Sequence, residues 1–209
     1  MNAIRMVWAP TLAVICCLWL LPGTGRAEAA EIRQYQGKPL QPFNRSYDNS
    51  IRGPQTVDVK KLRFKIDGLV AKPQRLTYER ILRLPHVRRV VTMPCVEGWS
   101  ERLLYDAVRL ADLIKLAGPK PGVKTVIFHA ADGYTSSLTW DWVKKHEVLL
   151  GFKINGLVLD KKRGFPFQVV TPGKLGYKWV KWVVAITLSD KPYRGYWERR
   201  GYSNEANVK

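Results

Sequence analysis

The sequence predicts a single α+β domain in which strands dominate. The chain has 209 residues, 46% of them apolar, which is enough to bury the core of one domain. Segments with strand periodicity outnumber those with helical periodicity, and the two do not alternate as they would in a parallel βαβ fold. No internal repeat or flexible linker divides residues 30–209. We therefore expect one domain over that range.

The elements of the first half follow from local patterns. Residues 31–60 are polar and rich in Asn, Gln, Gly and Pro, which predicts an extended arm. Apolar residues at 62, 64 and 66 alternate with basic ones, as in a half-buried strand. Thr77 can cap the helix that follows it. The remaining apolar spacing predicts a helix over 78–84, a strand over 87–93 and a helix over 106–117.

The second half is expected to consist mainly of strands. Asn155-Gly156 lies between two apolar runs and is a strong signal for a two-residue hairpin turn. The tail after residue 189 is aromatic and basic. The other expected elements are strands over 123–130, 147–154, 157–159, 167–170 and 180–188, a turn at 132–133 that leads into a strand, and a short helix over 140–145.

The first 29 residues have the pattern of an export signal. Arg5 precedes an uncharged stretch over 7–21, which as a helix reaches ~22 Å, less than the ~30 Å hydrocarbon core of a bilayer. Ala27-Glu28-Ala29 then fits a cleavage site. We expect residues 1–29 to be removed, leaving a periplasmic chain without a transmembrane span. An uncleaved membrane anchor is the alternative.

The net charge of the chain limits the kinds of partner that it is expected to bind, but it does not indicate the fold. The chain has 35 Lys and Arg against 17 Asp and Glu, a net charge of +18. Such a surface favours polyanions, acidic membranes, acidic proteins or small anionic substrates. Nucleic acid is not an expected partner, because an exported protein rarely meets it. The apolar content argues against disorder, and the composition against collagen and coiled coils.

Cys95 is the one cysteine that remains once the signal is removed. It follows a predicted strand, in the loop Pro94-Cys95-Val96-Glu97-Gly98-Trp99-Ser100. A single thiol in an exported chain can be a buried inert group, a nucleophile, half of an intermolecular disulfide or a metal ligand. The three histidines lack zinc-site spacing. A metal held by one thiolate would need its other ligands from a cofactor.

Several motifs together resemble the molybdopterin-binding domain of the sulfite oxidase superfamily. The motifs are Cys95-Val96-Glu97-Gly98-Trp99-Ser100, then Ala131-Asp132-Gly133-Tyr134, then Gly176-Tyr177-Lys178-Trp179-Val180-Lys181. They are most similar to the exported bacterial branch that includes the catalytic subunit of the periplasmic methionine sulfoxide reductase. The similarity runs in order from about residue 43 to the C-terminus.

The resemblance implies a role for each matching residue. Cys95 would be the only protein ligand of molybdenum in a molybdenum-molybdopterin cofactor, and Tyr134 could donate a hydrogen bond to an oxo group. Lys178 and Lys181 would hold the cofactor's terminal phosphate, although a solvated strand end is the other interpretation. Asn44, Tyr47 and Asp48 match the family's pterin contacts; without the resemblance they would be an ordinary polar loop.

Some positions depart from the methionine sulfoxide reductase branch. Ala130 replaces a threonine contact, Gln168 an arginine contact, and Arg163 lies near an asparagine position. One phosphate-facing charge could therefore be relocated. Arg102, Arg194, Arg199 and Arg200 are candidates for an anion-binding rim.

Two functional hypotheses follow. The first is an exported molybdenum oxidoreductase that moves an oxygen atom and two electrons to or from a small sulfoxide, sulfite or other anion. Its electron partner would be a separate cytochrome or membrane haem subunit, because the chain has no haem-attachment motif. The alternative is a non-catalytic periplasmic binding protein that keeps the fold without the metal. Replacing Cys95 by serine separates the two.

Overall fold

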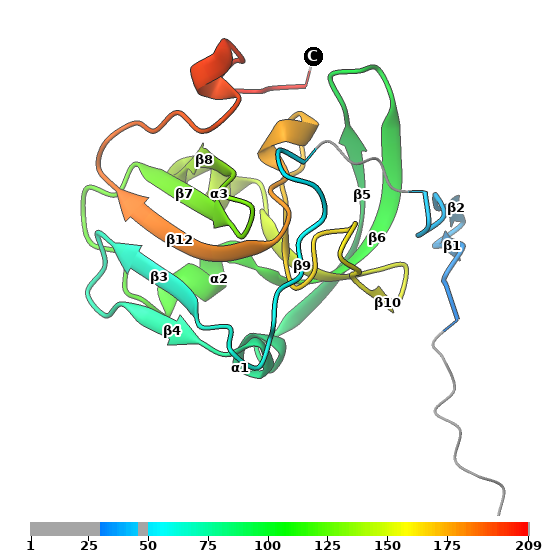
Figure 1. Ribbon diagram of the computed structural model, residues 1–209, viewed down its shortest axis with the longest axis horizontal. Helices are drawn as coiled ribbons and strands as arrows, with labels where there is room; N and C mark the ends of the chain where they lie inside the picture. The colour runs from blue at the N-terminus through cyan, green and yellow to red at the C-terminus, as the bar shows by residue number, and fades with distance from the viewer. Residues whose placement is uncertain (1–29, 46–49, 209) are drawn as a thin grey trace, which may run out of the picture.

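A computed structural model describes residues 30–45 and 50–208, and two sheets form most of it (Figure 1). One five-stranded sheet has the order β4-β3-β12-β7-β8. The other has the order β10-β9-β6-β5, with β11 also paired to β9. A two-stranded hairpin, β1-β2, belongs to the N-terminal arm. The strand-dominated α+β prediction is thereby confirmed.

Twelve strands and three α-helices occur in the described part of the chain. The strands are β1 (Gln34–Tyr35), β2 (Lys38–Pro39), β3 (Phe64–Gly68), β4 (Gln74–Leu76), β5 (His86–Pro94), β6 (Ser100–Arg109), β7 (Thr125–Ala130), β8 (Thr135–Thr139), β9 (Leu149–Ile154), β10 (Leu157–Val158), β11 (Gln168–Val170) and β12 (Val183–Ser189). The helices are α1 (Tyr78–Leu82), α2 (Leu110–Lys115) and α3 (Trp140–Lys145), with 3₁₀ turns η1 (Gly176–Lys178) and η2 (Glu198–Arg200).

The sheet containing β3 and β12 pairs segments that are far apart in sequence. β12 lies parallel to β3 and antiparallel to β7. Gly68 ends β3 with φ 83°, where a Cβ atom would lie 2.2 Å from the carbonyl oxygen of Leu188. Only glycine allows both this backbone conformation and this close approach. The alternation at residues 62–66 is confirmed by the buried Phe64 and Ile66.

The second sheet is built around the long β5-β6 hairpin, which stands on the right in Figure 1 with its turn at the top. The helix expected over 106–117 is wrong in its first four positions, because β6 continues to Arg109 and α2 begins at Leu110. Residues 103–108 are all buried. A strand covered on both faces is a continuous apolar run, which periodicity does not separate from a buried helix.

Two local sequence signals predicted the start of α1 and the β9-β10 hairpin correctly. The Thr77 side chain accepts a hydrogen bond from the Arg80 backbone N–H and caps α1. Asn155 and Gly156 both have positive φ, 53° and 83°, and join β9 to β10. These values are those of the turn that favours Asn-Gly in hairpins.

Helices close the main core. Ile81 of α1, Leu113 and Ile114 of α2 and Val143 of α3 all belong to the larger apolar cluster, together with Phe64 of β3. A smaller cluster lies around Tyr105, Leu149 and Trp179. None of the helices in residues 30–45 and 50–208 is long and apolar enough to cross a membrane. The expected export signal, residues 1–29, lies outside the described residues.

Candidate functional site

Cys95 lies in the turn that joins β5 to β6. Its backbone N–H donates to the Trp99 carbonyl at 2.8 Å, and the Gly98 N–H donates back to the Cys95 carbonyl at 3.2 Å. Gly98 has φ 85°, a conformation that suits glycine in such a turn. The thiol is unpaired and partly exposed. The hairpin thus carries one sulfur atom to the edge of the sheet.

Glu97 lies beside this thiol. The Cys95 Sγ atom is 4.0 Å from Glu97 Oε2, and the Trp99 indole N–H donates to the same oxygen at 2.8 Å. Burial and the negative charge of Glu97 raise the pKa of the Cys95 thiol. A metal cation bound to the sulfur would act in the opposite direction and favour the thiolate.

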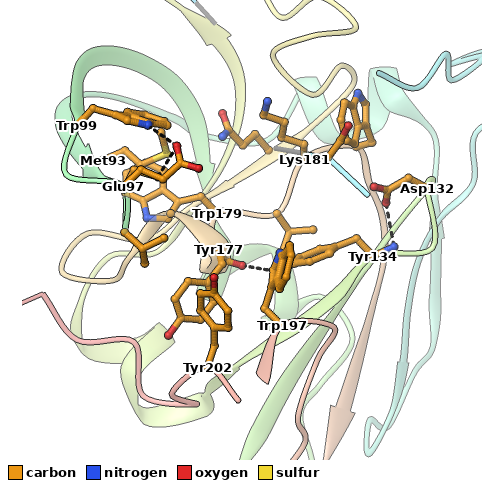
Figure 2. A pocket seen from close by; sticks show the side chains of 17 residues that line it. Met93, Glu97, Trp99, Asp132, Tyr134, Tyr177, Trp179, Lys181, Trp197 and Tyr202 are labelled. Atoms are coloured by element: carbon orange, nitrogen blue, oxygen red, sulfur yellow. Dashed lines mark hydrogen bonds between the residues drawn. The ribbon is translucent and has the colours of Figure 1, made fainter. Parts of the chain in front are cut away.

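Cys95 is one of the residues that line a cavity of about 400 Å³. Figure 2 shows this cavity. Aromatic side chains form much of its wall, and they come from the β5-β6 turn, the loop after β7, the segment around η1 and the C-terminal segment. The lining residues are Ser50, Met93, Cys95, Val96, Glu97, Trp99, Asp132, Tyr134, Gln168, Gly176, Tyr177, Trp179, Val180, Lys181, Trp182, Trp197 and Tyr202.

Tyr134 lines this cavity, but its hydroxyl is already engaged. It donates to the Tyr177 carbonyl at 2.6 Å, and the Tyr134 backbone N–H donates to Asp132 Oδ1 at 2.9 Å. Burial raises the pKa of the phenol well above its usual value, so the hydroxyl keeps its proton. In this arrangement Tyr134 holds the η1 turn in place, and its proton is not directed at a ligand in the cavity.

The two expected phosphate-binding lysines lie in different surroundings. Lys181 lines the cavity, whereas Lys178 does not. The Lys178 ammonium group is fully buried and forms an ion pair with Glu198 at 2.5 Å, with a further hydrogen bond to the Ser137 carbonyl at 2.9 Å. Of the two lysines expected to hold one phosphate, only Lys181 therefore lies at the cavity wall. The Lys178 charge is directed at Glu198 instead.

The expected pterin-binding arm is only partly described. Asn44 is exposed and does not line the cavity, while Tyr47 and Asp48 lie outside the described residues. Arg163 is buried and directed at this arm. Its guanidinium bonds to Glu101 at 2.8 Å and to the backbone carbonyls of residues 42, 43 and 45. These contacts engage the Arg163 guanidinium, and Arg163 is not among the residues that line the cavity.

The structure also places the other residues that differ from the methionine sulfoxide reductase branch. Gln168 lines the cavity and accepts a hydrogen bond from the Tyr105 hydroxyl at 3.4 Å. Ala130 is buried in the main core. None of the four arginines proposed as an anion-binding rim lines the cavity; they are Arg102, Arg194, Arg199 and Arg200.

Residues 51–197 match the model of the oxidoreductase molybdopterin binding domain family. The chain belongs to this family. The resemblance to the sulfite oxidase superfamily is thereby confirmed, and residues 51–197 form an oxidoreductase molybdopterin-binding domain. Its cavity beside Cys95 is the candidate site for that chemistry.

Curated relatives of this molybdopterin-binding domain include three bacterial proteins. YedZ1 of Azospira oryzae, named provisionally as a protein-methionine-sulfoxide reductase subunit, is 32% identical over 78% of this chain and 61% of its own length. The uncharacterized oxidoreductase YuiH of Bacillus subtilis is 34% identical over 71% of this chain and 76% of its own length. The protein-methionine-sulfoxide reductase catalytic subunit MsrP of Gluconobacter oxydans is 34% identical over 69% and 53%.

A solved structure shares the fold. The crystal structure of the sulfane dehydrogenase SoxCD from Paracoccus pantotrophus is 27% identical, with a TM-score of 0.69 over 79% of this chain and 45% of that one. The chain thus spans about half to three quarters of the length of these relatives.

The residues at the cavity fit the cofactor that this family binds. Cys95 offers one soft donor at the cavity edge, and a cofactor dithiolene would supply further sulfur ligands. Among the described residues, no group of three His, Cys, Asp or Glu side chains could hold a metal without such help. Gly176 lies close to the hairpin, since a Cβ atom there would be 3.5 Å from the Pro94 carbonyl oxygen and 3.8 Å from Cys95 Cα.

Sequence reasoning missed the contribution of the C-terminal segment to this molybdopterin-domain cavity. Trp197 and Tyr202 line it, although the segment was identified only as an aromatic, basic tail. Trp179 and Trp182 are buried and also border the cavity. The clustering of aromatic residues in the tail was the available signal, but aromatic residues in a tail equally suit packing.

Proposed function

We propose that this protein is an exported, molybdenum-dependent oxidoreductase that transfers an oxygen atom and two electrons to or from a small substrate such as a sulfoxide or sulfite. One observation carries the proposal: an unpaired cysteine lies in a tight hairpin turn at the wall of a 400 Å³ cavity, within a molybdopterin-binding family domain. The relatives named as methionine-sulfoxide reductases support the sulfoxide class.

The protein residues would position the cofactor and shield the reaction. Cys95 would bind molybdenum through Sγ, and Lys181 would attract the negative charge of the cofactor phosphate. The bound cofactor supplies the redox chemistry of oxygen transfer. The Glu97 carboxylate, fixed by the Trp99 indole, would exchange protons beside the sulfur. The aromatic wall would limit access of bulk water.

The balance of atoms requires a separate redox partner. A sulfoxide that accepts two electrons and two protons yields a sulfide and one water molecule, and sulfite oxidation runs in the opposite sense, taking up water and releasing two electrons. A cytochrome or a membrane haem subunit would deliver or accept the electrons. The excess of basic side chains would favour an acidic docking surface on that partner.

Export is part of the same proposal. Residues 1–29 would direct the chain out of the cytoplasm, and residues 30–209 would form the mature periplasmic domain. N-terminal sequencing of the protein recovered from the periplasm tests this. A mature chain that begins at Ala30 is expected, and a periplasmic chain that retains Met1 would contradict cleavage.

Metal analysis tests the central proposal. Full-length protein is produced in a host grown with ample molybdate, and its molybdenum and pterin are measured beside those of Cys95→Ser and of Thr92→Ser. Thr92 is an exposed residue of β5, so its exchange is a conservative control nearby. We expect stoichiometric molybdenum in the wild type and in the control, and a strong loss of metal with retained circular dichroism in Cys95→Ser.

The result also separates the alternative function. Wild-type protein that folds but carries only traces of molybdenum would refute the enzyme proposal. If that metal-free protein bound sulfite or another anion with an affinity unchanged by Cys95→Ser, a binding protein would be the correct description.

A further inference from the structure

One wall of the cavity comes from residues at and beyond the end of the family match. The match ends at residue 197, whereas the cavity is also lined by Tyr202. Trp197 and Tyr202 lie together, with ring centroids 5.3 Å apart. Tyr202 also meets Tyr177 edge to face at 5.2 Å. The three rings form an aromatic wall, defined here as Tyr177, Trp197 and Tyr202.

The wall is fixed by a buried ion pair. Glu198 follows Trp197 and has no exposed surface, as is true of its partner Lys178 in η1. Glu198 Oε1 accepts from the Lys178 ammonium group at 2.5 Å and from the Ser136 hydroxyl at 2.6 Å. The Lys178 ammonium group also reaches Asn204 Oδ1 at 3.4 Å. A charge pair buried in this way ties the C-terminal segment to the η1 turn.

Further contacts hold the same segment beyond Tyr202. The Lys174 ammonium group donates to the Glu205 carbonyl and to Asn207 Oδ1, both at 2.6 Å. The Leu175 N–H donates to the Ala206 carbonyl at 2.9 Å. These contacts lie on the residues that immediately precede η1. Residues 203–208 therefore pack along the segment that leads into η1, and this packing keeps Tyr202 beside the cavity.

The aromatic wall offers ring surface to the cavity. In Figure 2, Tyr202 lies in the lower part of the view, away from Lys181 and Asp132 in the upper part, and Glu97 lies near Trp99. The Tyr177 hydroxyl donates to the Ser203 carbonyl at 2.7 Å, so this polar group is already engaged within the protein. Tyr202 is 38% exposed, which leaves this surface open to an entering molecule.

We propose that Trp197 and Tyr202 determine specificity by selecting substrates with a flat apolar group beside the reacting atom, and that the Lys178–Glu198 pair positions them. The inference rests on the proposed oxidoreductase function and refines its substrate class. Aromatic rings favour stacked or edge-to-face contact with another flat group, whereas a small oxyanion gains little from them. The selected substrates are thus aryl or similarly flat sulfoxides.

A binding experiment tests the wall without any turnover. Methyl phenyl sulfone and dimethyl sulfone, which cannot donate a sulfoxide oxygen, are titrated into the purified protein while tryptophan fluorescence is recorded. We expect the aryl sulfone to bind more tightly, and Tyr202→Ala to weaken it about tenfold with little effect on dimethyl sulfone. Tyr35→Ala, in the β1 strand outside the cavity wall, is the matched control and is expected to bind as wild type.

A kinetic experiment applies the same comparison to the loaded enzyme. The ratio of kcat/KM for methyl phenyl sulfoxide to that for dimethyl sulfoxide is measured. Tyr202→Ala is expected to lower this ratio about tenfold, mainly through KM of the aryl substrate. An unchanged ratio would overturn the specificity role while leaving the oxidoreductase intact. Absence of turnover with both substrates in the wild type would instead count against the proposed function.

The positioning role of the ion pair needs its own variants. Glu198→Ala is expected to lower the substrate ratio, and Glu198→Gln to restore part of it, because an amide oxygen can still accept from Lys178. If the ion pair had only a structural role, both variants would change the free energy of unfolding and neither would change the ratio of kcat/KM values. If Glu198→Ala folds and keeps the wild-type ratio, the positioning role is wrong. If Glu198→Ala does not fold, Glu198→Gln takes its place: a ratio below that of the wild type is expected, and a wild-type ratio overturns the positioning role.

Discussion

Arg163 is the residue whose removal should most disturb the arm that precedes the candidate site. Its guanidinium forms a two-bond contact with Glu101, at 2.8 Å and 3.3 Å. Its Nε atom donates to the carbonyl of Phe43 at 2.9 Å, and Nη2, which also bonds to Glu101, donates to the carbonyls of Pro42, at 3.2 Å, and Arg45. Arg163→Met removes all these donors but retains an unbranched side chain that fills the inner part of the same space.

The cost can be worked out from the burial of the partner. Glu101 is 2% exposed, so the substitution leaves a buried carboxylate without its counter-charge, for which about 3–5 kcal/mol is typical. The arm carbonyls lie nearer the surface and can turn to water, so they add little. The double variant Arg163→Met/Glu101→Gln removes the stranded charge, and its cost should fall to about 1–2 kcal/mol.

Equilibrium unfolding in urea measures these free energies, with limited proteolysis at Arg45 as a local readout. Arg45 is exposed but its carbonyl is held by Arg163, so cleavage there should accelerate in the variant. Arg89 pairs with Glu147 at 2.5 Å on the surface and supplies the matched control, since Arg89→Met should cost under about 1 kcal/mol. Equal losses for Arg163→Met and Arg89→Met would refute the reasoning, as would strictly additive losses in the double variant.

Three further experiments test other parts of the fold. Thr77→Ala should lower the free energy of unfolding by about 1 kcal/mol in urea titrations, because α1 loses its N-cap. Gly195→Ala should cost more than about 3 kcal/mol, since its Cβ atom would lie 2.2 Å from the Thr135 carbonyl oxygen, whereas Gly201→Ala, with open space around it, should cost only about 1 kcal/mol. Burial lowers the pKa of His129 below 6.5, although the negative charge of Asp67 acts in the opposite direction. The free energy of unfolding should therefore fall as the pH drops below 6.5 towards the pKa of the folded state. His129→Gln should remove this part of the pH dependence. Equal thermal shifts for the two glycine variants, an unchanged pH profile in His129→Gln, or a neutral Thr77→Ala would each contradict the corresponding argument.

Elements with local physical causes could be predicted from the sequence. The hairpin at Asn155-Gly156 depends on two residues that tolerate positive φ, and the α1 start depends on one hydroxyl. The Cys95 loop was also placed correctly at the end of a strand. Each of these outcomes is determined within a few residues, so tertiary packing had little scope to change it.

The extent of β6 could not be predicted in the same way. Residues 106–109 carry a pattern compatible with a helix, and their state was decided by partners distant in sequence. β5 pairs with one side of β6 and β9 with the other, so that Val108 lies opposite both His86 and Leu150. Pairing on both edges satisfies the backbone of residues that otherwise suit a helix.

The different surroundings of Lys178 and Lys181 could not be predicted from the sequence either. Lys178 and Lys181 are three residues apart, and the resemblance implied one role for both. The partner that separates them is Glu198, twenty residues beyond Lys178 and outside the matched family range. Whether an ammonium group faces a ligand or an internal carboxylate depends on how the C-terminal segment returns to the turn. Spacing contains no information about that return.

The net charge of the chain likewise does not predict which charged side chains line the cavity. A net charge of +18 predicts attraction of anions, but the arginines of η2 use their guanidinium groups outside the cavity: Arg199 donates to the Arg194 carbonyl, and Arg200 stacks on Tyr196 at 3.6 Å. The cavity wall instead combines aromatic rings with Glu97, Asp132 and Lys181. Long-range charge governs which molecules approach, because it acts over about a Debye length of ~8 Å in physiological salt. The contacts within the wall govern which of them fit, and those contacts depend on the packing of the C-terminal segment.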